Sequence, residues 1–175
     1  MNETIKTLLE RRSVRTYSDK LVPDNVLKEI LKAGTYAPSG MGKQSAKIVL
    51  IKNKEVRDKV AKLNAAVMGR DADPFYGAPY VAVVFADKNV MTYLYDGSLV
   101  MGNLLNAAYS LGVDSCWIHR AKEVFESAEG KALMKEWGLS QDYEGIGNCI
   151  LGYRKEDSPE IKAKERKEDF VTVIE

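Results

Sequence analysis

The sequence has few residues of the kinds that cross-link a chain or bind a metal. Its two cysteines, Cys116 and Cys149, lie far apart in apolar surroundings and form no Cys-x-x-Cys spacing. We therefore expect reduced thiols, as in cytoplasmic proteins, and no structural disulfide. The single histidine, His119, has no partners at the spacing of a zinc site, so no metal is expected.

Long hydrophobic runs and an excess of either charge are also missing. The longest uninterrupted apolar stretch, Tyr80–Ala86, is far too short to span a bilayer. The 26 Lys and Arg residues balance 25 Asp and Glu, so the overall charge gives no reason to expect binding to nucleic acid or membranes. The start, MNETIKTLLERR, lacks the apolar core of a secretory signal. Together these absences predict a cytoplasmic protein.

Two glycine-rich segments do not meet the requirements of nucleotide-binding motifs. The loop APSGMGKQS, Ala37–Ser45, lacks the first glycine and the last Ser or Thr of a P-loop, and no strand precedes it. The segment GIGNCILG has isoleucine where the dinucleotide fingerprint needs its third glycine. A GxSxG nucleophile motif is absent, and His119 is better explained as a strand-end surface histidine than as a catalytic base.

The 175 residues fit one domain with a sizeable core. Apolar periodicity and capping residues predict, in chain order, helices after Asn2 and from Pro23, a strand Lys47–Ile51, a helix Lys54–Met68, strands Tyr80–Ala86 and Val113–Ile118, a helix pair interrupted at Gly130, and a strand within Tyr143–Tyr153. The inward face of the third helix is expected to carry Val56, Val60, Ala61, Leu63 and Val67.

The segment Asp96–Gly112 is apolar nearly all the way round, which predicts a buried central helix. Small residues among its large ones would let another backbone approach closely. The helix could therefore serve both the core and a self-association face, or only the core of a monomer.

The last part of the chain combines a charged arm with an apolar end. RKEDSPEIKAKERKED has the composition of a solvated segment, whereas the following FVTVIE favours a β-strand. A loose strand of this kind is a liability, so we expect it to join a sheet edge. A charged arm with an anchored end would let the chain reach across a partner.

Arginines surround Ser13 in the run RRSVR. Arg11, Arg12 and Arg15 repel one another unless they are solvated or face a shared anion. A solvated helix end is the alternative, since cations also suit the end of a helix dipole. The loop Ala37–Ser45 has hydroxyls and free backbone N–H groups that could bind a polar ligand. The alternative is a plain connector between a helix and a strand.

Four segments, in this order, resemble the nitroreductase family of flavoproteins: RRSVR, APSGMGKQ, DGSLVMGNLLNAAYSLGVDSCWI and KAKERK. The resemblance covers nearly the whole chain. It implies an α+β domain, residues 1–175, with a mixed central sheet of four to five strands wrapped by helices. It also implies a domain-swapped homodimer in which residues 154–175 form an arm that reaches the partner subunit.

The same resemblance implies bound FMN, with NAD(P)H as electron donor and hydride transfer through flavin N5 to nitroaromatic, quinone or similar small-molecule acceptors. It implies phosphate and ribityl contacts from Arg11, Arg12 and Ser13, a cation near the pyrimidine edge from Arg15, and a returning basic pair, Lys164 and Arg166. The partner-side loop would hold Pro38, Ser39, Gly40 and Gln44, and backbone N–H groups near His119 and Arg120 would contact N5. No side chain need act as acid or base in the hydride step.

The sequence departs from the family pattern at two places in the loop, because Gly42 replaces a common Asn and Ser45–Ala46 replaces a Pro-Trp pair. Two other functions fit the same residues. One is a non-catalytic dimeric module that binds flavin or another phosphate ligand, and the other is an enzyme of this fold that consumes or dehalogenates its ligand.

Overall fold

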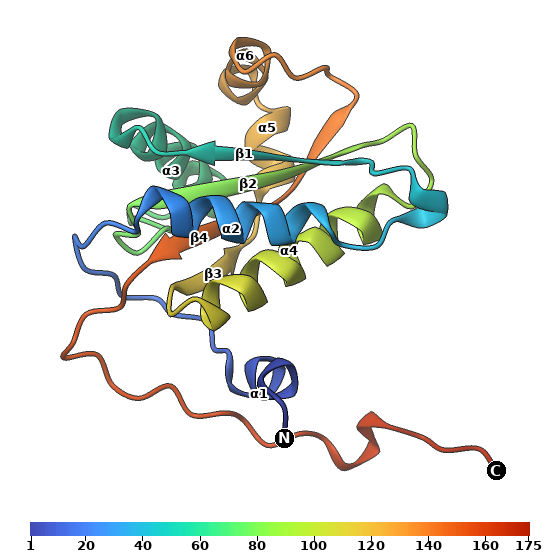
Figure 1. Ribbon diagram of the computed structural model, residues 1–175. Coiled ribbons are helices and arrows are strands. Elements are labelled where there is room, and N and C mark those ends of the chain that lie inside the picture. Colours follow the sequence, from blue (N-terminus) through green and yellow to red (C-terminus); the bar gives the residue numbers. More distant parts are fainter.

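The centre of the protein is a four-stranded sheet with the spatial order β1-β2-β4-β3. The computed structural model describes residues 1–175 (Figure 1). The strands are β1 (Ala46–Ile51), β2 (Tyr80–Asp87), β3 (Asp114–Ile118) and β4 (Tyr143–Gly152). The α+β class and the four strands of the sequence prediction are confirmed.

The direction of the strands corrects one expectation, because the sheet is antiparallel rather than mixed. The crossover from β2 to β3 leaves these two strands running the same way. However, β4 inserts between them and is antiparallel to both, so every pair of neighbours is antiparallel. The only parallel contact is an isolated bridge between Ser13 and Ser115.

The six α-helices are α1 (Glu3–Glu10), α2 (Asp24–Thr35), α3 (Lys54–Met68), α4 (Tyr93–Ser110), α5 (Ala121–Glu126) and α6 (Ala128–Glu136). Five of the six cover the two faces of the sheet, whereas α1 lies against α4 and buries none of its residues. Alternate residues of β2 divide the core: Val81, Val83 and Phe85 pack with α3, α5 and α6, whereas Ala82, Val84 and Ala86 pack with α2 and α4. Because helices cover β2 on both faces, its side chains are apolar on both sides, which explains the uninterrupted apolar run at Tyr80–Ala86.

Helix ends follow local capping chemistry. The side chains of Asn2 and Asn53 accept hydrogen bonds from the first turns of α1 and α3, each at 3.0 Å. The bounds predicted for α3 are confirmed. The predicted break at Gly130 is wrong, because Ser127 separates α5 from α6 and caps α6 through the Gly130 N–H. Gly130 instead lets the α6 backbone lie against the end of α5, where a Cβ would collide.

The inward face of α3 also differs from the prediction. It carries Arg57 and Asn64 among small apolar residues, whereas Val67 is 42% exposed. The apolar periodicity of the sequence places Val67 on the buried face. In the structure that face is rotated, so that Arg57 and Asn64 are buried and Val67 is exposed. Their contacts, described below, explain why they are buried.

The cysteines are free and buried, which confirms the prediction of reduced thiols. Cys116 pairs with Ile150, and Cys149 pairs with Trp117. Since side chains alternate along a strand, the two thiols point to opposite faces of the sheet and cannot bond to each other. Burial raises the pKa of both thiols.

Helix α4 is buried on one side only. Val100, Met101 and Leu104 pack into the core, but Tyr95 is 73% exposed and Leu99 is 46% exposed. The expectation of a helix buried all round is therefore wrong for the single chain, which leaves an apolar face uncovered. None of the helices has the length and hydropathy needed to cross a lipid bilayer.

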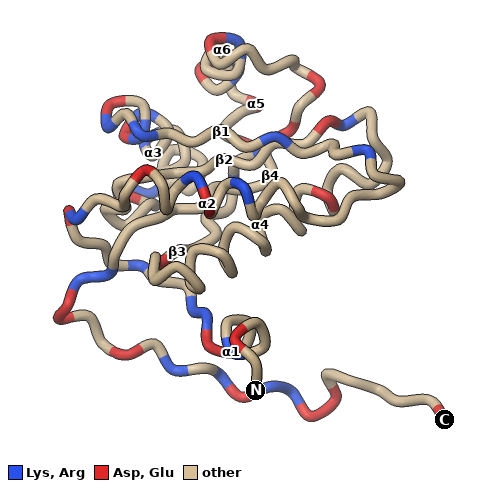
Figure 2. The backbone as a smooth tube through the Cα atoms, viewed as in Figure 1, with Lys and Arg blue, Asp and Glu red and all other residues tan.

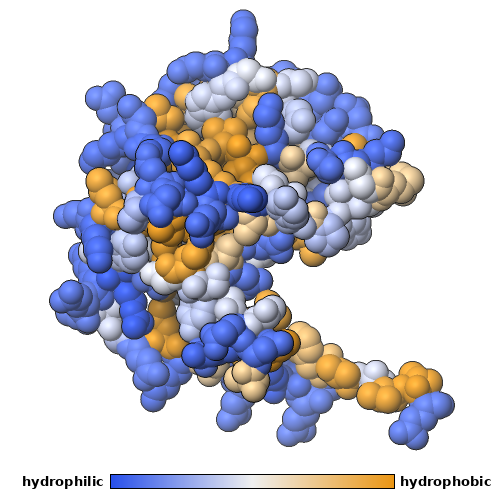
Figure 3. All heavy atoms as spheres, viewed as in Figure 1, coloured by the Kyte–Doolittle hydropathy of each residue, from blue (hydrophilic) through white to orange (hydrophobic).

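Residues 154–175 leave the sheet and run past α1 as an extended arm (Figure 1). Basic and acidic residues follow one another along it, as Figure 2 shows. The apolar end stands clear of the body, and Ile174 is 88% exposed (Figure 3). The expected edge strand does not form within the chain: the outer edge of β1 lies on the far side of the body from the arm, and the segment at Ser13 and Val14 occupies the start of the outer edge of β3.

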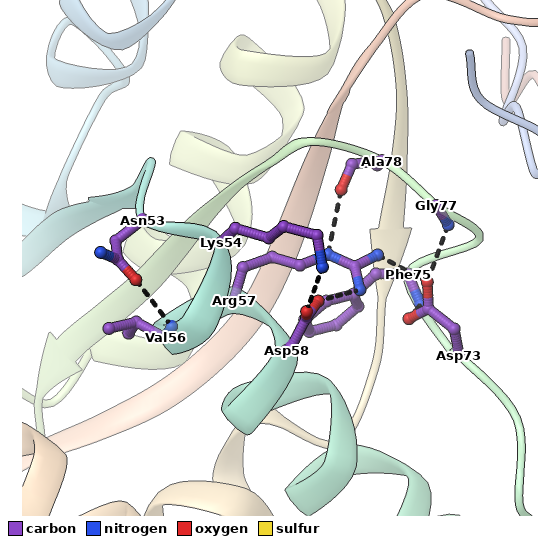
Figure 4. Close-up of polar contacts among 9 residues, drawn as sticks. All are labelled: Asn53, Lys54, Val56, Arg57, Asp58, Asp73, Phe75, Gly77 and Ala78. Atoms are coloured by element: carbon purple, nitrogen blue, oxygen red, sulfur yellow. Dashed lines mark hydrogen bonds and ion pairs between the residues drawn. The ribbon is translucent and has the colours of Figure 1, made fainter. Parts of the chain in front are cut away.

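A buried arginine ties the loop between α3 and β2 to the body (Figure 4). The Arg57 side chain is only 9% exposed. Its Nε donates to the Ala78 carbonyl at 3.0 Å, and its Nη2 contacts Asp73 at 2.6 Å. Its Nη1 contacts Asp58 at 3.0 Å, and the group lies 5.3 Å from the centre of the Phe75 ring. Each of the three guanidinium nitrogens of Arg57 therefore has a hydrogen-bond partner.

Asp73 completes this clamp from the loop side. Its carboxylate accepts the N–H groups of Phe75 at 2.9 Å and Gly77 at 2.8 Å (Figure 4). The turn thereby places the Phe75 ring in the core, with no exposed surface. The loop is thus held by the Arg57–Asp73 ion pair together with the hydrogen bonds that both side chains make to its backbone.

Replacing Arg57 with methionine should lower the free energy of unfolding by about 2–3 kcal/mol, because the Ala78 carbonyl and Asp73 lose a buried partner. Methionine keeps much of the apolar stem. Urea unfolding measures the effect, and Arg70→Met, at an exposed position in the same loop, is the matched control. Equal urea midpoints for Arg57→Met and the wild type would contradict a stabilising clamp.

Candidate functional site

The arginine run lies along the outer edge of β3. Ser13 bridges to Ser115, and the Val14 N–H donates to the Ser115 carbonyl at 3.1 Å. Arg11 and Arg12 are partly buried, whereas Arg15 is exposed. The segment after α1 is therefore held beside the start of an edge strand, with its cations near the sheet.

Two guanidinium nitrogens in this run are buried without a partner, Arg11 Nη1 and Arg12 Nε. Arg12 also caps α1, since its Nη1 donates to the carbonyls of Leu9 at 2.7 Å and Arg11 at 2.8 Å. A helix-end role therefore accounts for part of Arg12 but not for Arg11. Burying a charged donor without a partner is costly, so this arrangement fits a bound anion.

A pocket of about 430 Å³ opens beside the run. Its wall includes Arg11, Arg12, Ser115 and Arg154, and the Ser115 hydroxyl is a third buried polar group with no partner. The arm contributes Arg154, Glu160 and Ile161 to this wall, and the acidic residues Glu10 and Asp114 also line it. The later cations of the arm do not join it: Lys164 and Arg166 are exposed and lie beyond the pocket, with Arg166 Nη2 donating to the Lys164 carbonyl at 2.8 Å.

The loop with Pro38, Ser39, Gly40 and Gln44 lies between α2 and β1 and lines a separate pocket of about 380 Å³. The single chain does not bring this loop to the arginine run. Its backbone is unusual, because Met41 and Gln44 both have positive φ angles, 52° and 49°. Such conformations are unfavourable for residues with a side chain and persist where surrounding contacts hold them.

Within the loop the Gln44 N–H donates to Ser39 Oγ at 3.0 Å, and Asp96 of α4 holds the residues on either side of the positive-φ pair. Its carboxylate, 3% exposed, accepts hydrogen bonds from the Gly40 N–H at 3.0 Å, the Ser45 hydroxyl at 2.6 Å and the Thr92 hydroxyl at 3.1 Å. Burial raises the pKa of Asp96, but the three hydrogen bonds together lower it below its ordinary value. The sequence prediction missed this residue, although a single acid on an otherwise apolar helix face was the available signal.

The Asp96 contribution to stability should disappear in acid. A lowered folded-state pKa means that the contribution is present above the ordinary value of 3.8 and is lost as the pH falls through the folded-state pKa. Asp96→Asn should therefore lower stability by about 1–3 kcal/mol at neutral pH, and by less in acid. Urea unfolding at several pH values measures this, with exposed Asp71→Asn as control. Stability curves that stay parallel down to the lowest pH would contradict the assignment.

The end of β3 carries His119 and Arg120. His119 is exposed, which confirms a surface histidine at a strand end. Arg120 is partly buried and has a positive φ of 72°. The backbone N–H groups of both residues have no hydrogen-bond partner. The first of these donors, the His119 N–H, lies four residues beyond Ser115, about 13 Å along an extended strand.

Two larger cavities, of about 710 and 750 Å³, flank the Arg57 clamp. The guanidinium at their border is fully partnered, in contrast to that of Arg11. Nowhere do three or more His, Cys, Asp or Glu side chains come together in a group that could hold a metal ion. The unpaired donors therefore single out the edge of β3.

Residues 8–153 match the family model described as the nitroreductase family. The chain belongs to the nitroreductase family. A provisionally named NADH dehydrogenase/NAD(P)H nitroreductase of Archaeoglobus fulgidus is 30% identical over 172 residues, which are 95% of this chain and 94% of that protein. The resemblance inferred from the four segments is thus confirmed over nearly the full length.

Solved nitroreductase structures agree with the fold. A nitroreductase with bound FMN from Bacteroides fragilis has a TM-score of 0.92 and 28% identity, covering 100% of both chains. Another with bound FMN, from Desulfitobacterium hafniense, has a TM-score of 0.88 and 27% identity, again over 100% of both chains. The nitroreductase fold therefore extends through the arm as well as the sheet.

Proposed function

We propose that this nitroreductase-family chain is an FMN-dependent oxidoreductase of the cytoplasm, which transfers hydride from NAD(P)H to nitroaromatic, quinone or similar small acceptors. The observation that carries the proposal is Arg11 Nη1, a buried cationic donor with no hydrogen-bond partner. Arg11 lines a pocket together with Ser115, whose buried hydroxyl also has no partner. A phosphate dianion would satisfy such donors. Full-length structural neighbours with bound FMN support the choice of ligand.

In this proposal the two ends of β3 hold the two ends of FMN. Arg11, Arg12 and Ser13 bind the phosphate and ribityl chain at the start of the strand. The free N–H groups of His119 and Arg120 face the N5 edge of the ring at its end. The separation of about 13 Å along the strand suits a ligand with an anionic tail and a ring that accepts hydrogen bonds.

We further propose a homodimer of single-domain subunits, residues 1–175, in which residues 154–175 form an arm that crosses the partner. Support comes from exposed apolar surface: Leu8 and Leu9 of α1, Leu99 of α4, and the end of the arm. Such side chains mark an interaction site where they form a contiguous apolar patch. When the arm binds across the partner subunit, Lys164 and Arg166 would contact the FMN phosphate.

The loop with Pro38, Ser39, Gly40 and Gln44 would then wall the partner subunit's flavin. Its separation from the arginine run within one chain supports this arrangement. The Asp96 hydrogen bonds fix the loop shape in advance, which lowers the entropic cost of closing the site.

FMN, when bound, supplies a ring whose N5 accepts hydride from NAD(P)H and passes it to an acceptor that takes the same place. The exposed Arg15 guanidinium would hold positive charge near the pyrimidine edge, where it favours the anionic reduced ring. Backbone N–H groups orient the ring, and no side chain transfers a proton in the hydride step. The buried thiols, whose pKa burial raises, take no part.

The absorption spectrum of the purified protein tests this proposal, followed by anaerobic reduction with NADH or NADPH. Oxidised-flavin bands that bleach with the donor and recover with a nitroaromatic or quinone are the expected result. Bands that persist with either donor would favour a non-catalytic binding module. Irreversible loss of the chromophore during turnover would favour an enzyme that consumes its ligand.

A further inference from the structure

Two side-chain amides hold the end of β3 from inside the protein. Asn64 of α3 and Asn148 of β4 are both 0% exposed. Asn64 Nδ2 donates to the His119 carbonyl at 2.8 Å. Asn148 Nδ2 donates to the carbonyls of Ile118 at 3.2 Å and His119 at 3.4 Å. Buried amides are expensive, and both of these are directed at the same backbone.

The planarity of the peptide bond determines what these contacts do. In a trans peptide the N–H points opposite to the C=O, and the chain has no cis peptide. Because the His119 carbonyl is drawn inward, the N–H of Arg120 must point outward. The same argument turns the N–H of His119 outward, since the Ile118 carbonyl is also held. Both donors are left unpaired.

Arg120 contributes to this arrangement through its own side chain. A positive φ of 72° is unfavourable for a residue with a Cβ. Arg120 Nε donates to Asn64 Oδ1 at 3.0 Å, which holds the side chain back against α3. Asn64 therefore fixes both sides of the peptide, one through its amide nitrogen and the other through its oxygen.

We infer that Asn64 and Asn148 are positioning residues that aim the His119 and Arg120 N–H groups at flavin N5. This inference rests on the proposed function. Oxidised flavin presents a lone pair at N5, whereas reduced flavin carries a hydrogen there. An N–H aimed at N5 therefore favours the oxidised form, and a tilted peptide weakens the binding of oxidised FMN more than that of reduced FMN.

Asn64→Asp tests this with little change of shape. The carboxylate keeps the acceptor for Arg120 but places a second acceptor against the His119 carbonyl, which turns the peptide. We expect oxidised FMN to bind about tenfold more weakly and reduced FMN to change less. A tenfold change in that ratio raises the two-electron midpoint potential by about 30 mV. Both affinities and the potential are measured on the full chain.

Asn53→Asp is the matched control, because Asn53 caps the same helix and aspartate caps equally well. It should retain the wild-type ratio. A second pair of variants covers the case in which Asn64→Asp does not fold. In Arg120→Ala the positive φ loses its support, whereas glycine tolerates it, so Arg120→Ala should shift the ratio further than Arg120→Gly.

Wild-type ratios in folded, FMN-bound Asn64→Asp would overturn this inference and leave the proposed function standing. If Asn64→Asp does not fold, equal ratios in Arg120→Ala and Arg120→Gly overturn it in the same way. Failure of the wild-type chain to bind FMN would overturn the proposed function and, with it, this inference.

Discussion

Assayed without added FMN, a heterodimer with Arg11→Ala in one chain and Ser39→Trp in the other should show about half of the wild-type NAD(P)H oxidation per dimer, although each homodimer should be inactive. Arg11→Ala removes the proposed phosphate contact, and Ser39→Trp blocks the loop that would wall the partner's flavin. If every site is shared by two chains, one site of the heterodimer collects both lesions. The other site collects neither and regains activity.

The reciprocal heterodimer is the control. A doubly substituted chain, Arg11→Ala with Ser39→Trp, paired with a wild-type chain puts one lesion into each shared site, so it should be inactive. If each site belonged to one chain, the two results would be exchanged. Differently tagged chains allow both heterodimers to be purified, and size-exclusion chromatography checks their assembly. Activity of the reciprocal form alone would refute shared sites.

The affinity for FMN should fall about ten- to a hundredfold in Arg11→Ala, since a buried charge-assisted contact contributes about 1.5–3 kcal/mol. Fluorescence titration of the apoprotein with FMN measures this. The apoprotein itself should be no less stable than the wild type, because Arg11 Nη1 has no partner to lose. A substitution that weakens ligand binding without lowering the stability of the apoprotein is typical of a residue whose role is to bind the ligand.

Lys6→Ala supplies the comparison for Arg11→Ala. It removes an exposed cation from α1, the helix that ends just before Arg11, and should leave the affinity for FMN unchanged. Arg12→Ala differs in kind, because Arg12 also caps α1, so this variant should lose both affinity and helix stability. An Arg11→Ala protein that purifies with a full complement of FMN would refute the phosphate contact.

Local patterns predicted the elements well and their partners less well. The capped, periodic segment Lys54–Met68 and the apolar run at Tyr80 carry their own signals, and both formed as predicted. The direction of a strand has no such local signal, because it depends on β4 inserting between β2 and β3. The end of the arm illustrates the same limit: FVTVIE favours a strand, but within the single chain residues 171–175 form no strand and are exposed.

The residues proposed for the site divide in the same way. The run RRSVR stands out because clustered like charges demand an explanation, and its unpaired nitrogens support the one given. Asp96, Asn64 and Asn148 stand out only as polar residues within apolar segments, a pattern that has many other causes. Apart from Thr92, four positions before Asp96, their hydrogen-bond partners lie 29 to 56 positions away in the sequence, so only the folded chain identifies them.

The central place of β4 also determines when the protein can fold during synthesis. Neither β2 nor β3 has its shared neighbour until residues 143–152 have left the ribosome. Until then α4 connects two strands that cannot pair with each other, and most of the apolar core has been made but not closed. The four-stranded sheet can therefore be completed only late in translation, although β1 and β2 can pair earlier, and a truncation before Tyr143 removes the strand that joins β2 to β3.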